Sequence, residues 1–262
     1  MTPAVPAPSL AELARIEDAG LNASAPPQQR VLDGWLLRFS PGKAKRARCI
    51  NAVSAGRLPL ADKLLLCEQA YAQAALPMIV RITPFSEPEP LDETLTGMGL
   101  RRFDDTQVMV LSDMQSLDES PSLGQATLQP VPGADFAQAI GALRGSPASQ
   151  RNAHAERLRH SPVPYRGFVV QRHGETLACG QYVVEADMVG LYDVFTAPAA
   201  RGRGVARALC RALLLRARDE EGARRAYLQV ESDNLAAQAV YRRLGFADAY
   251  AYHYRTRDPE AA

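Results

Sequence analysis

The chain lacks the features that mark several classes of protein. Its four cysteines, Cys49, Cys67, Cys179 and Cys210, lie far apart, and it has no CxxC pair and no cysteine–histidine cluster. This spacing favours neither a disulfide framework nor a zinc site, and it is typical of proteins from a reducing compartment. We therefore expect no metal ion and a cytoplasmic location.

An excess of charge of one sign and a long hydrophobic run are also missing. The formal net charge of the 262 residues is +1, whereas a dedicated nucleic-acid or membrane-surface binder is usually lopsided in charge. No apolar run is long enough to span a bilayer, and the N-terminus has no basic stretch followed by an apolar one. With 47% apolar and 23% charged residues, the composition predicts an ordinary globular protein that binds neither nucleic acid nor membrane.

A polar stretch from Ser112 to Gln125 divides the chain. It contains Pro and Gly and shows no hydrophobic period, which is typical of a linker between domains. We expect an N-terminal domain over residues 1–118 and a C-terminal domain over residues 119–262.

Hydrophobic periods predict mixed helices and strands in the N-terminal domain. Ser9 can cap a first helix, which Gly20 would end. Residues 34–39 and 43–53 can form a hairpin of two strands. A helix from Ala61, a strand over 77–82, a short helix over 89–99 and a strand over 105–111 complete this half.

Mixed helices and strands are predicted in the C-terminal half as well. A strand over 126–131 and helices over 134–145 and 146–160 precede three strands in a meander over 166–198. A helix reaching about Glu221, a strand over 224–230, a helix over 234–245 and a strand over 247–255 follow. Antiparallel strands followed by a β-loop-α-β-α-β unit indicate the α+β class, with a mixed, mostly antiparallel sheet flanked by helices.

The stretch RGRGVA, residues 201–206, lies between an apolar strand and a helix. The free N–H groups and the dipole at a helix N-terminus attract anions, and Gly202 and Gly204 would let a phosphate approach the backbone. Arg201 and Arg203 add full positive charges. The loop therefore favours a diphosphate, although a plain solvated turn is the alternative; it is neither a P-loop nor a dinucleotide fingerprint, because the required Lys-Ser/Thr and third glycine are missing.

A second motif follows the next strand. Residues 234–246 place Asn234, Ala237, Tyr241, Gly245 and Phe246 in the pattern N-x-x-A-x-x-x-Y-x-x-x-G-F. Together with R-x-x-G-x-A at 201–206, this pattern resembles the GCN5-related N-acetyltransferase (GNAT) superfamily. The resemblance covers roughly residues 125–256, including the order of the elements.

The resemblance implies that a CoA thioester, most simply acetyl-CoA, binds between two splayed parallel strands. The pyrophosphate would bind the backbone of Arg201, Gly202, Arg203, Gly204, Val205 and Ala206. The pantetheine arm would pair with Val194, Phe195 and Thr196, and Asn234 and Ala237 would flank it. Tyr241 would lie near the sulfur.

The implied chemistry is the direct attack of a neutral amine on the thioester. A backbone N–H near Val194 can stabilise the oxyanion, and Tyr241 can protonate the leaving thiolate. Asp193 and Glu231 are the candidate general bases, and ordered water is a third. Tyr192 and Asp193 would face opposite sides of their strand unless a bulge re-aims them.

Several questions stay open at this stage. The N-terminal half resembles a degenerate second copy of the fold, because it repeats the helix–strand order without the phosphate loop. An idle acyl-CoA sensor and a nucleotide enzyme of another class, such as a kinase, are alternatives to an acyltransferase. The acceptor could be a small-molecule or peptide amine, and a homodimer is possible. His154 and His160 are expected to be exposed polar residues rather than catalytic ones.

Overall fold

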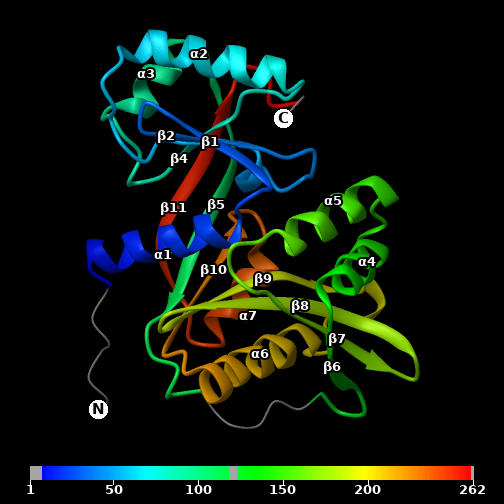
Figure 1. Ribbon diagram of the computed structural model, residues 1–262. Coiled ribbons are helices and arrows are strands. Elements are labelled where there is room, and N and C mark those ends of the chain that lie inside the picture. The colour runs from blue at the N-terminus through cyan, green and yellow to red at the C-terminus, as the bar shows by residue number, and fades with distance from the viewer. Residues whose placement is uncertain (1–7, 118–122, 261–262) are drawn as a thin grey trace. The chain divides into compact units, whose positions relative to one another are not determined.

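The computed structural model describes residues 8–117 and 123–260, which divide into two compact units (Figure 1). Unit 1 contains the chain up to Ala23 together with Val108–Val230 and Asn234–Ala249. Unit 2 contains Ser24–Gln107, Glu231–Asp233 and the chain from Tyr250 onward. Each unit therefore uses segments from both halves of the sequence.

The sheet of unit 1 contains the predicted meander. Its strands neighbour one another in the order β10–β9–β8–β7–β6, and all pairs are antiparallel except β9 with β10, which is parallel. The bounds are β6 Thr127–Val131, β7 Arg166–Arg172, β8 Glu175–Glu185, β9 Met188–Thr196 and β10 Arg225–Glu231.

Helices cover both faces of this sheet. A Cβ atom on Gly180 would lie 3.1 Å from Leu213, so α6 (Val205–Glu221) packs on the face to which Gly180 points. A Cβ atom on Gly167 would lie 3.0 Å from Phe136, so α4 (Gly133–Arg144) packs on the other face. α5 (Ala148–Arg159) packs against α4, and α7 (Leu235–Arg242) packs against α6.

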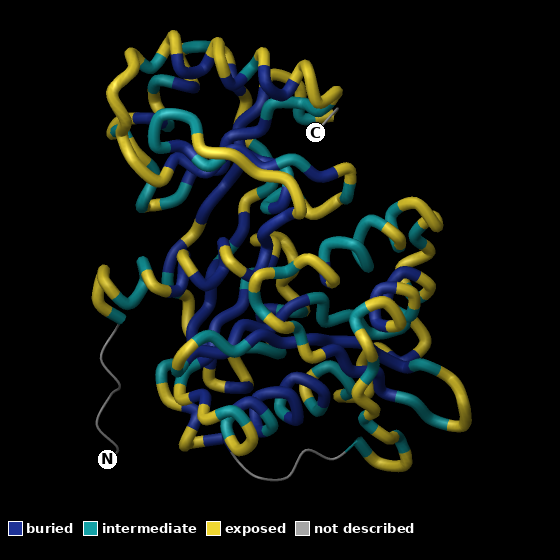
Figure 2. The backbone as a smooth tube through the Cα atoms, in the orientation of Figure 1, coloured by how far each residue is buried: buried dark blue, intermediate teal, exposed yellow. Residues whose placement is uncertain are grey.

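The main core of unit 1 lies between the sheet and α6. Leu209, Leu213 and Leu214 of α6 are fully buried there against strand residues such as Val189 and Leu228. Figure 2 shows the corresponding dark blue stretches in the strands and along one side of α6. Burying this apolar surface fixes the ends of β9, β10 and α6, which carry the candidate site.

The first helix, α1 (Leu10–Ala23), belongs to unit 1. Ser9 caps it as predicted: its Oγ accepts from the Glu12 N–H at 3.3 Å, and its own N–H donates to Glu12 Oε2 at 2.8 Å. The prediction that Gly20 ends the helix is wrong. Gly20 is instead a close-packing position, because a Cβ atom there would come within 2.9 Å of the Gln229 side chain.

Unit 2 contains shorter paired strands and a core of its own around Trp35, Tyr71 and Leu95. The predicted hairpin is only partly formed, because residues 45–47 make a 3₁₀ turn and only Ile50–Asn51 pairs with the preceding strand. An exposed edge strand over 28–32 was missed, since it follows prolines in the sequence. The elements are β1 Gln28–Leu32, β2 Trp35–Phe39, η1 Lys45–Ala47, β3 Ile50–Asn51, α2 Leu60–Gln73, β4 Val80–Ile82 and α3 Leu91–Gly97.

Two long strands contribute residues to both units. β5 (Arg101–Leu111) neighbours β10, although it ends the N-terminal half of the sequence. β11 (Ala247–Thr256) ends the C-terminal half, and its residues 253–255 pair with β4. Each half of the sequence thus supplies a strand to the sheet of the other.

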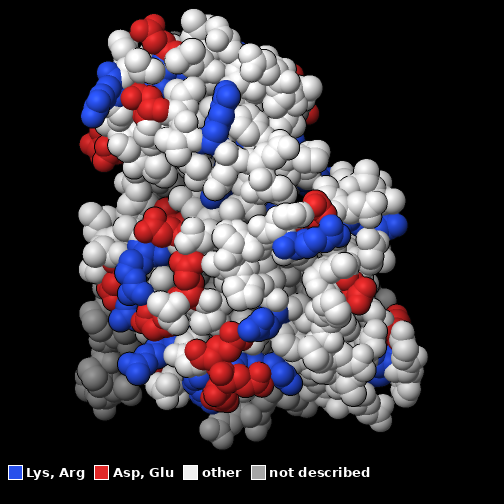
Figure 3. Space-filling view, viewed as in Figure 1, with Lys and Arg blue, Asp and Glu red and all other residues white. Residues whose placement is uncertain are grey.

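The surface charges and the state of the four cysteines agree with the near-zero net charge and the wide spacing of the cysteines. Acidic and basic side chains lie interspersed on the face drawn in Figure 3. All four cysteines are buried as free thiols. Within residues 8–117 and 123–260, no helix combines the length and the apolar character needed to cross a membrane.

Candidate active site

The parallel strands β9 and β10 separate at their carboxyl ends. Their pairing runs from Met188 with Arg225 to Leu191 with Leu228, and then stops. β9 nevertheless continues to Thr196 and β10 to Glu231. The splayed pair of strands expected from the sequence is therefore present, with Val194, Phe195 and Thr196 on the part of β9 that β10 no longer pairs.

A bulge interrupts β9 at the point where the strands part. Cys179 pairs with Phe195 and Gln181 pairs with Tyr192, so Asp193 and Val194 together oppose the single residue Gly180. Asp193 has a φ of 51°, in the left-handed region that is uncommon for residues other than glycine. The bulge re-aims the carboxylate, and Gln181, which lies opposite Tyr192, donates its Nε2 hydrogen to Asp193 Oδ2 at 2.8 Å. Tyr192 and Asp193 therefore share a face.

Three further side chains from α4 and α5 reach Asp193. Arg144 NH1 donates to Oδ1 at 3.2 Å, His154 Nε2 lies 3.3 Å from Oδ2, and Arg157 NH2 lies 3.9 Å from Oδ2. Burial would raise the pKa of Asp193, but His154, Arg144 and Arg157 outweigh it and hold that pKa far below its usual range. The carboxylate is consequently ionised at neutral pH and is a weak proton acceptor.

Sequence reasoning missed most of this group, here named the Asp193 cluster: Arg144, His154, Arg157, Gln181 and Asp193. The expectation that His154 is exposed is wrong, because its side chain is only 17% exposed and stands edge-on to Phe136, with centroids 6.2 Å apart. His160 is exposed as expected. No motif links residues of two helices and two strands, so only the packing of α4 and α5 on the sheet could reveal the cluster.

Aromatic rings surround the cluster on the same side of the sheet. Phe195 lies between two guanidinium groups, with Arg144 at 5.4 Å and Arg201 at 5.6 Å from the ring centroid. Tyr165 contacts Tyr192 edge-on, and the Tyr192 hydroxyl is hydrogen-bonded to the Tyr227 hydroxyl at 2.6 Å. Apart from its polar centre, this face of β9 is therefore aromatic.

The RGRGVA loop has two open glycines at positive φ and leads into the free N-terminus of α6. Gly202 and Gly204 have φ values of 74° and 77°, and a Cβ atom on either would meet no atom within 4 Å. Gly204 is the N-cap of α6 and carries no side-chain cap. Within the described part of the chain, the N–H groups of Gly204, Val205 and Ala206 have no hydrogen-bond acceptor. They are free to bind a ligand, and the helix dipole favours an anion there.

The two arginines of the motif, Arg201 and Arg203, differ in how they are held. Arg201 donates from Nε to the Thr196 carbonyl at 3.3 Å, which ties the loop to the end of β9. Arg203 is exposed and lines a hollow of about 670 Å³ beside the loop. The other lining residues of this hollow are Leu123, Gly124, Gln125, Ala126, Val170, Arg172, Glu175, Leu177, Ala199, Ala200 and Val205.

The second motif forms α7 as predicted. Asn234 caps the helix, with its Oδ1 accepting from the Ala237 N–H at 3.1 Å, so its Nδ2 group remains available. Tyr241 packs edge-on against Phe246 and against the core of unit 1. Burial, with a smaller contribution from Cys210, raises the pKa of the Tyr241 hydroxyl. No described residue hydrogen-bonds to that hydroxyl, which stays protonated at neutral pH.

Glu231 is not part of the Asp193 cluster. It is the exposed last residue of β10, and it belongs with Ser232 and Asp233 to unit 2. Nothing in unit 1 therefore supports it as a partner of Asp193.

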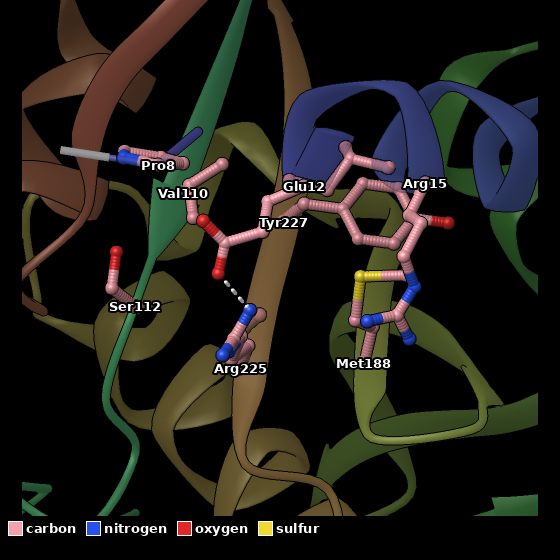
Figure 4. A pocket seen from close by; sticks show the side chains of 10 residues that line it. Pro8, Glu12, Arg15, Val110, Ser112, Met188, Arg225 and Tyr227 are labelled. Atoms are coloured by element: carbon pink, nitrogen blue, oxygen red, sulfur yellow. Dashed lines mark hydrogen bonds and ion pairs between the residues drawn. The ribbon is translucent and has the colours of Figure 1, made fainter. Parts of the chain in front are cut away.

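A second hollow of unit 1, of about 130 Å³, lies at the other ends of β9 and β10 (Figure 4). Glu12 and Arg225 form an ion pair in it, and Arg15 binds Asp187 at 2.8 Å. Because its charged groups already pair with one another, this hollow lacks the free donors of the RGRGVA loop. Nor do the described residues contain a group of three or more side chains placed to hold a metal ion.

Comparisons with known proteins agree with this geometry. Residues 137–246 match the model of the Acetyltransferase (GNAT) family. An uncharacterized N-acetyltransferase, YobR, of Bacillus subtilis (strain 168) is 26% identical over 232 residues, which are 87% of this chain and 92% of that protein. The predicted resemblance to the GNAT family is thereby confirmed over residues 137–246.

Solved structures show the same fold. A GCN5-related N-acetyltransferase from Kribbella flavida superposes with a TM-score of 0.72 at 18% identity, covering 96% of this chain and 97% of that one. A tandem GNAT protein from the clavulanic acid biosynthesis pathway superposes with a TM-score of 0.57 at 15% identity, covering 78% of this chain and 72% of that one. The predicted α+β GNAT fold is confirmed.

Proposed function

We propose that the protein transfers an acetyl group from acetyl-CoA to an amine, and the match of residues 137–246 to the Acetyltransferase (GNAT) family supports this proposal. The observation that carries the proposal is the separation of β9 from β10 beside a glycine loop whose N–H groups have no acceptor. Acetyl-CoA supplies an activated acyl group and a thiol leaving group. The residues of this chain bind and position acetyl-CoA and stabilise the charges that develop on the oxyanion and the leaving thiolate.

The loop residues 201–206 are the proposed pyrophosphate site. The free N–H groups at the start of α6 and the positive φ of Gly202 and Gly204 fit a diphosphate, and Arg203 adds charge. The hollow beside Arg203 offers room for the nucleotide end of CoA. Val194, Phe195 and Thr196 present to the pantetheine arm the edge of β9 that β10 no longer pairs, and Asn234 and Ala237 flank the arm from α7.

We propose that the reaction is a direct transfer between two bound substrates. The amine nitrogen forms a bond to the thioester carbonyl carbon, and the carbon–sulfur bond breaks, giving an amide and CoA. The backbone N–H of Val194 stabilises the oxyanion. Tyr241, whose raised pKa keeps it protonated, gives a proton to the leaving thiolate.

The proton released by the amine needs an acceptor. The ion pairs that lower the pKa of Asp193 make its carboxylate a weak base, and Glu231 lies exposed in unit 2. We therefore propose water as the proton acceptor. The role assigned to Asp193 is to hold the polar side chains of its cluster in place.

The N-terminal half is proposed to be a degenerate copy of the same fold. The order α2–β4–α3–β5 repeats the order α6–β10–α7–β11, and each half gives its last strand to the other sheet. A division of the sequence into domains 1–118 and 119–262 remains a prediction. So do a homodimer and a cytoplasmic location.

Thermal unfolding with ligands tests the proposed function. Acetyl-CoA and CoA should raise the midpoint, while ATP and NADPH should not, because a ligand that binds only the native state stabilises it by mass action. Gly204→Val should abolish the shift, since its side chain would fill the space at the free N–H groups. The matched control is Gly222→Val at the other end of α6, where φ is 74° and the surroundings are equally open.

The outcomes separate the alternatives. No shift with acetyl-CoA, or an equal shift in Gly204→Val, would refute the loop assignment. A shift without turnover on a broad panel of amines would support an idle acyl-CoA sensor. A shift with ATP and Mg²⁺ alone would point to a nucleotide enzyme.

A further inference from the structure

The Asp193 cluster contains more positive than negative charge. All the ion pairs of Arg144 and Arg157 within the described residues go to one carboxylate, that of Asp193. Apart from His154, two guanidinium groups and one carboxylate leave a net charge of +1. A positive charge that is removed from water without a full partner is costly, so such a site favours an additional anion.

Arg157 shows this imbalance most clearly. Its side chain is only 11% exposed, yet its polar contacts are long: 3.5 Å to the Ala23 carbonyl, 3.5 Å to the Tyr165 hydroxyl and 3.9 Å to Asp193. Good N–H···O bonds are 2.7–3.2 Å long, so this guanidinium is held near acceptors without being saturated by them. The Arg144 side chain is more exposed, at 38%, and its NH1 group donates a hydrogen bond to Asp193.

The cluster is next to the proposed reaction centre. Asp193 immediately precedes Val194, whose N–H is the proposed oxyanion donor, and the bulge turns the Asp193 carboxylate toward α4 and α5. Phe195 lies two residues after Asp193 on the same strand, and the Arg144 guanidinium lies over its ring. A group bound by Arg144 and Arg157 would therefore lie a few bonds from an amine that attacks beside Val194.

A buried acceptor atom adds a second, independent observation. Gln181 is fully buried, and its Oε1 has no hydrogen-bond partner among the described residues, while its Nε2 is committed to Asp193. An unsatisfied buried acceptor is destabilising, and a donor on a ligand would remove that cost. The amine N–H of an acceptor is such a donor.

Resting on the proposed acetyl transfer, we propose that the acceptor is an amine that also carries a carboxylate close to the nitrogen, as in an α-amino acid. Arg144 and Arg157 bind the carboxylate, for which the planar guanidinium is well suited, and Gln181 Oε1 accepts from the amine N–H. Acceptors with several positive charges, such as polyamines and aminoglycosides, are disfavoured by repulsion from the two arginines.

Matched substrate pairs test the inference in the wild-type protein. L-Phenylalanine is compared with 2-phenylethylamine, and L-leucine with 3-methylbutylamine, so that each pair differs by the carboxylate alone. The readout is acetyl-CoA-dependent release of CoA thiol, confirmed by mass spectrometry of the N-acetyl product. One charge-assisted contact corresponds to a preference in kcat/KM of roughly tenfold to a hundredfold for the amino acid.

Arginine variants locate the preference. Arg144→Gln and Arg157→Gln should lose most of the amino-acid preference, through a higher KM, and change the activity on the decarboxylated amines little. Arg159→Gln is the control, because this residue lies on the same helix, is 68% exposed and pairs only with Glu156. A purely structural role of the arginines would lower both activities together and would refute the assignment.

The failure of this inference differs from that of the proposed function. Equal or better activity on the decarboxylated amines overturns the inference and leaves the acetyltransferase intact. A protein that acetylates neither set but is stabilised by acetyl-CoA overturns the inference alone, and a protein that acetylates neither set and is not stabilised by acetyl-CoA overturns both. The wild-type comparison decides the question even if an arginine variant does not fold.

Discussion

Replacing Asp193 with Asn tests how the centre of the site is held together. The change removes one negative charge from a cluster with two guanidinium groups, while Asn is among the few residues that tolerate the left-handed φ of 51° at this bulge. Backbone strain should therefore stay nearly constant. The variant therefore tests the loss of the Asp193 negative charge with little change in the backbone.

The magnitude follows from burial. Breaking a buried ion pair costs about 3–5 kcal/mol, whereas an exposed pair contributes at most about 1 kcal/mol. The side chains here are intermediate, 21% exposed for Asp193 and 38% for Arg144, so we expect a loss of about 2 kcal/mol. For a protein of this size, that corresponds to a fall in Tm of roughly 4–8 °C.

The effect of pH has a definite sign. The folded-state pKa of Asp193 lies below its unfolded value, so its contribution is present above a pH of about 4 and is lost as pH falls through the folded pKa. The difference in Tm between wild type and Asp193→Asn should be constant from about pH 8 to pH 5 and shrink only in stronger acid. Thermal unfolding followed by circular dichroism at each pH measures both the Tm difference and its dependence on pH.

A matched control is Asp248→Asn, which breaks an exposed pair with Arg242, 49% and 48% exposed respectively. It should cost less than about 1 kcal/mol. If Asp193→Asn were as stable as wild type, or no worse than the control, the cluster would not be held by its carboxylate. If the Asp193→Asn variant folded but lost an increase of kcat/KM with pH that wild type shows, Asp193 would be the base after all.

Two further predictions concern Tyr241 and Asp92. Tyr241→Phe should lower kcat by roughly a hundredfold with KM for acetyl-CoA nearly unchanged, because the phenol is proposed to act only on the leaving thiolate; an unchanged kcat in steady-state assays would exclude it as the acid. In unit 2, Arg255 and His253 lower the pKa of Asp92 to about 2, so the stability that it adds is present above about pH 4 and disappears as pH falls toward 2. The Tm difference between wild type and Asp92→Asn should therefore close over that interval, and a difference that persists at pH 2 would contradict the ion-pair assignment.

The sequence by itself determined the elements whose signals are local. Ser9 and Glu12 form a capping box within four residues, and Asn234 caps α7 with its side chain alone. The glycines at 202 and 204 leave open space beside the loop, as the sequence suggested, although their positive φ was not predicted. These features depend on neighbours in the chain, so the two motifs and the order of elements were enough to predict the GNAT fold.

Only the tertiary structure decided what surrounds the reaction centre. Strand alternation predicts opposite faces for Tyr192 and Asp193, and the bulge opposite Gly180 puts them on one face. Gly20 looks like a helix stop, but it lies inside α1, where its Cα faces the end of the Gln229 side chain. The partners of Asp193 come from α4, α5 and β8, up to 49 residues away along the chain. Such contacts arise from packing between distant segments, and no local pattern in the sequence encodes them.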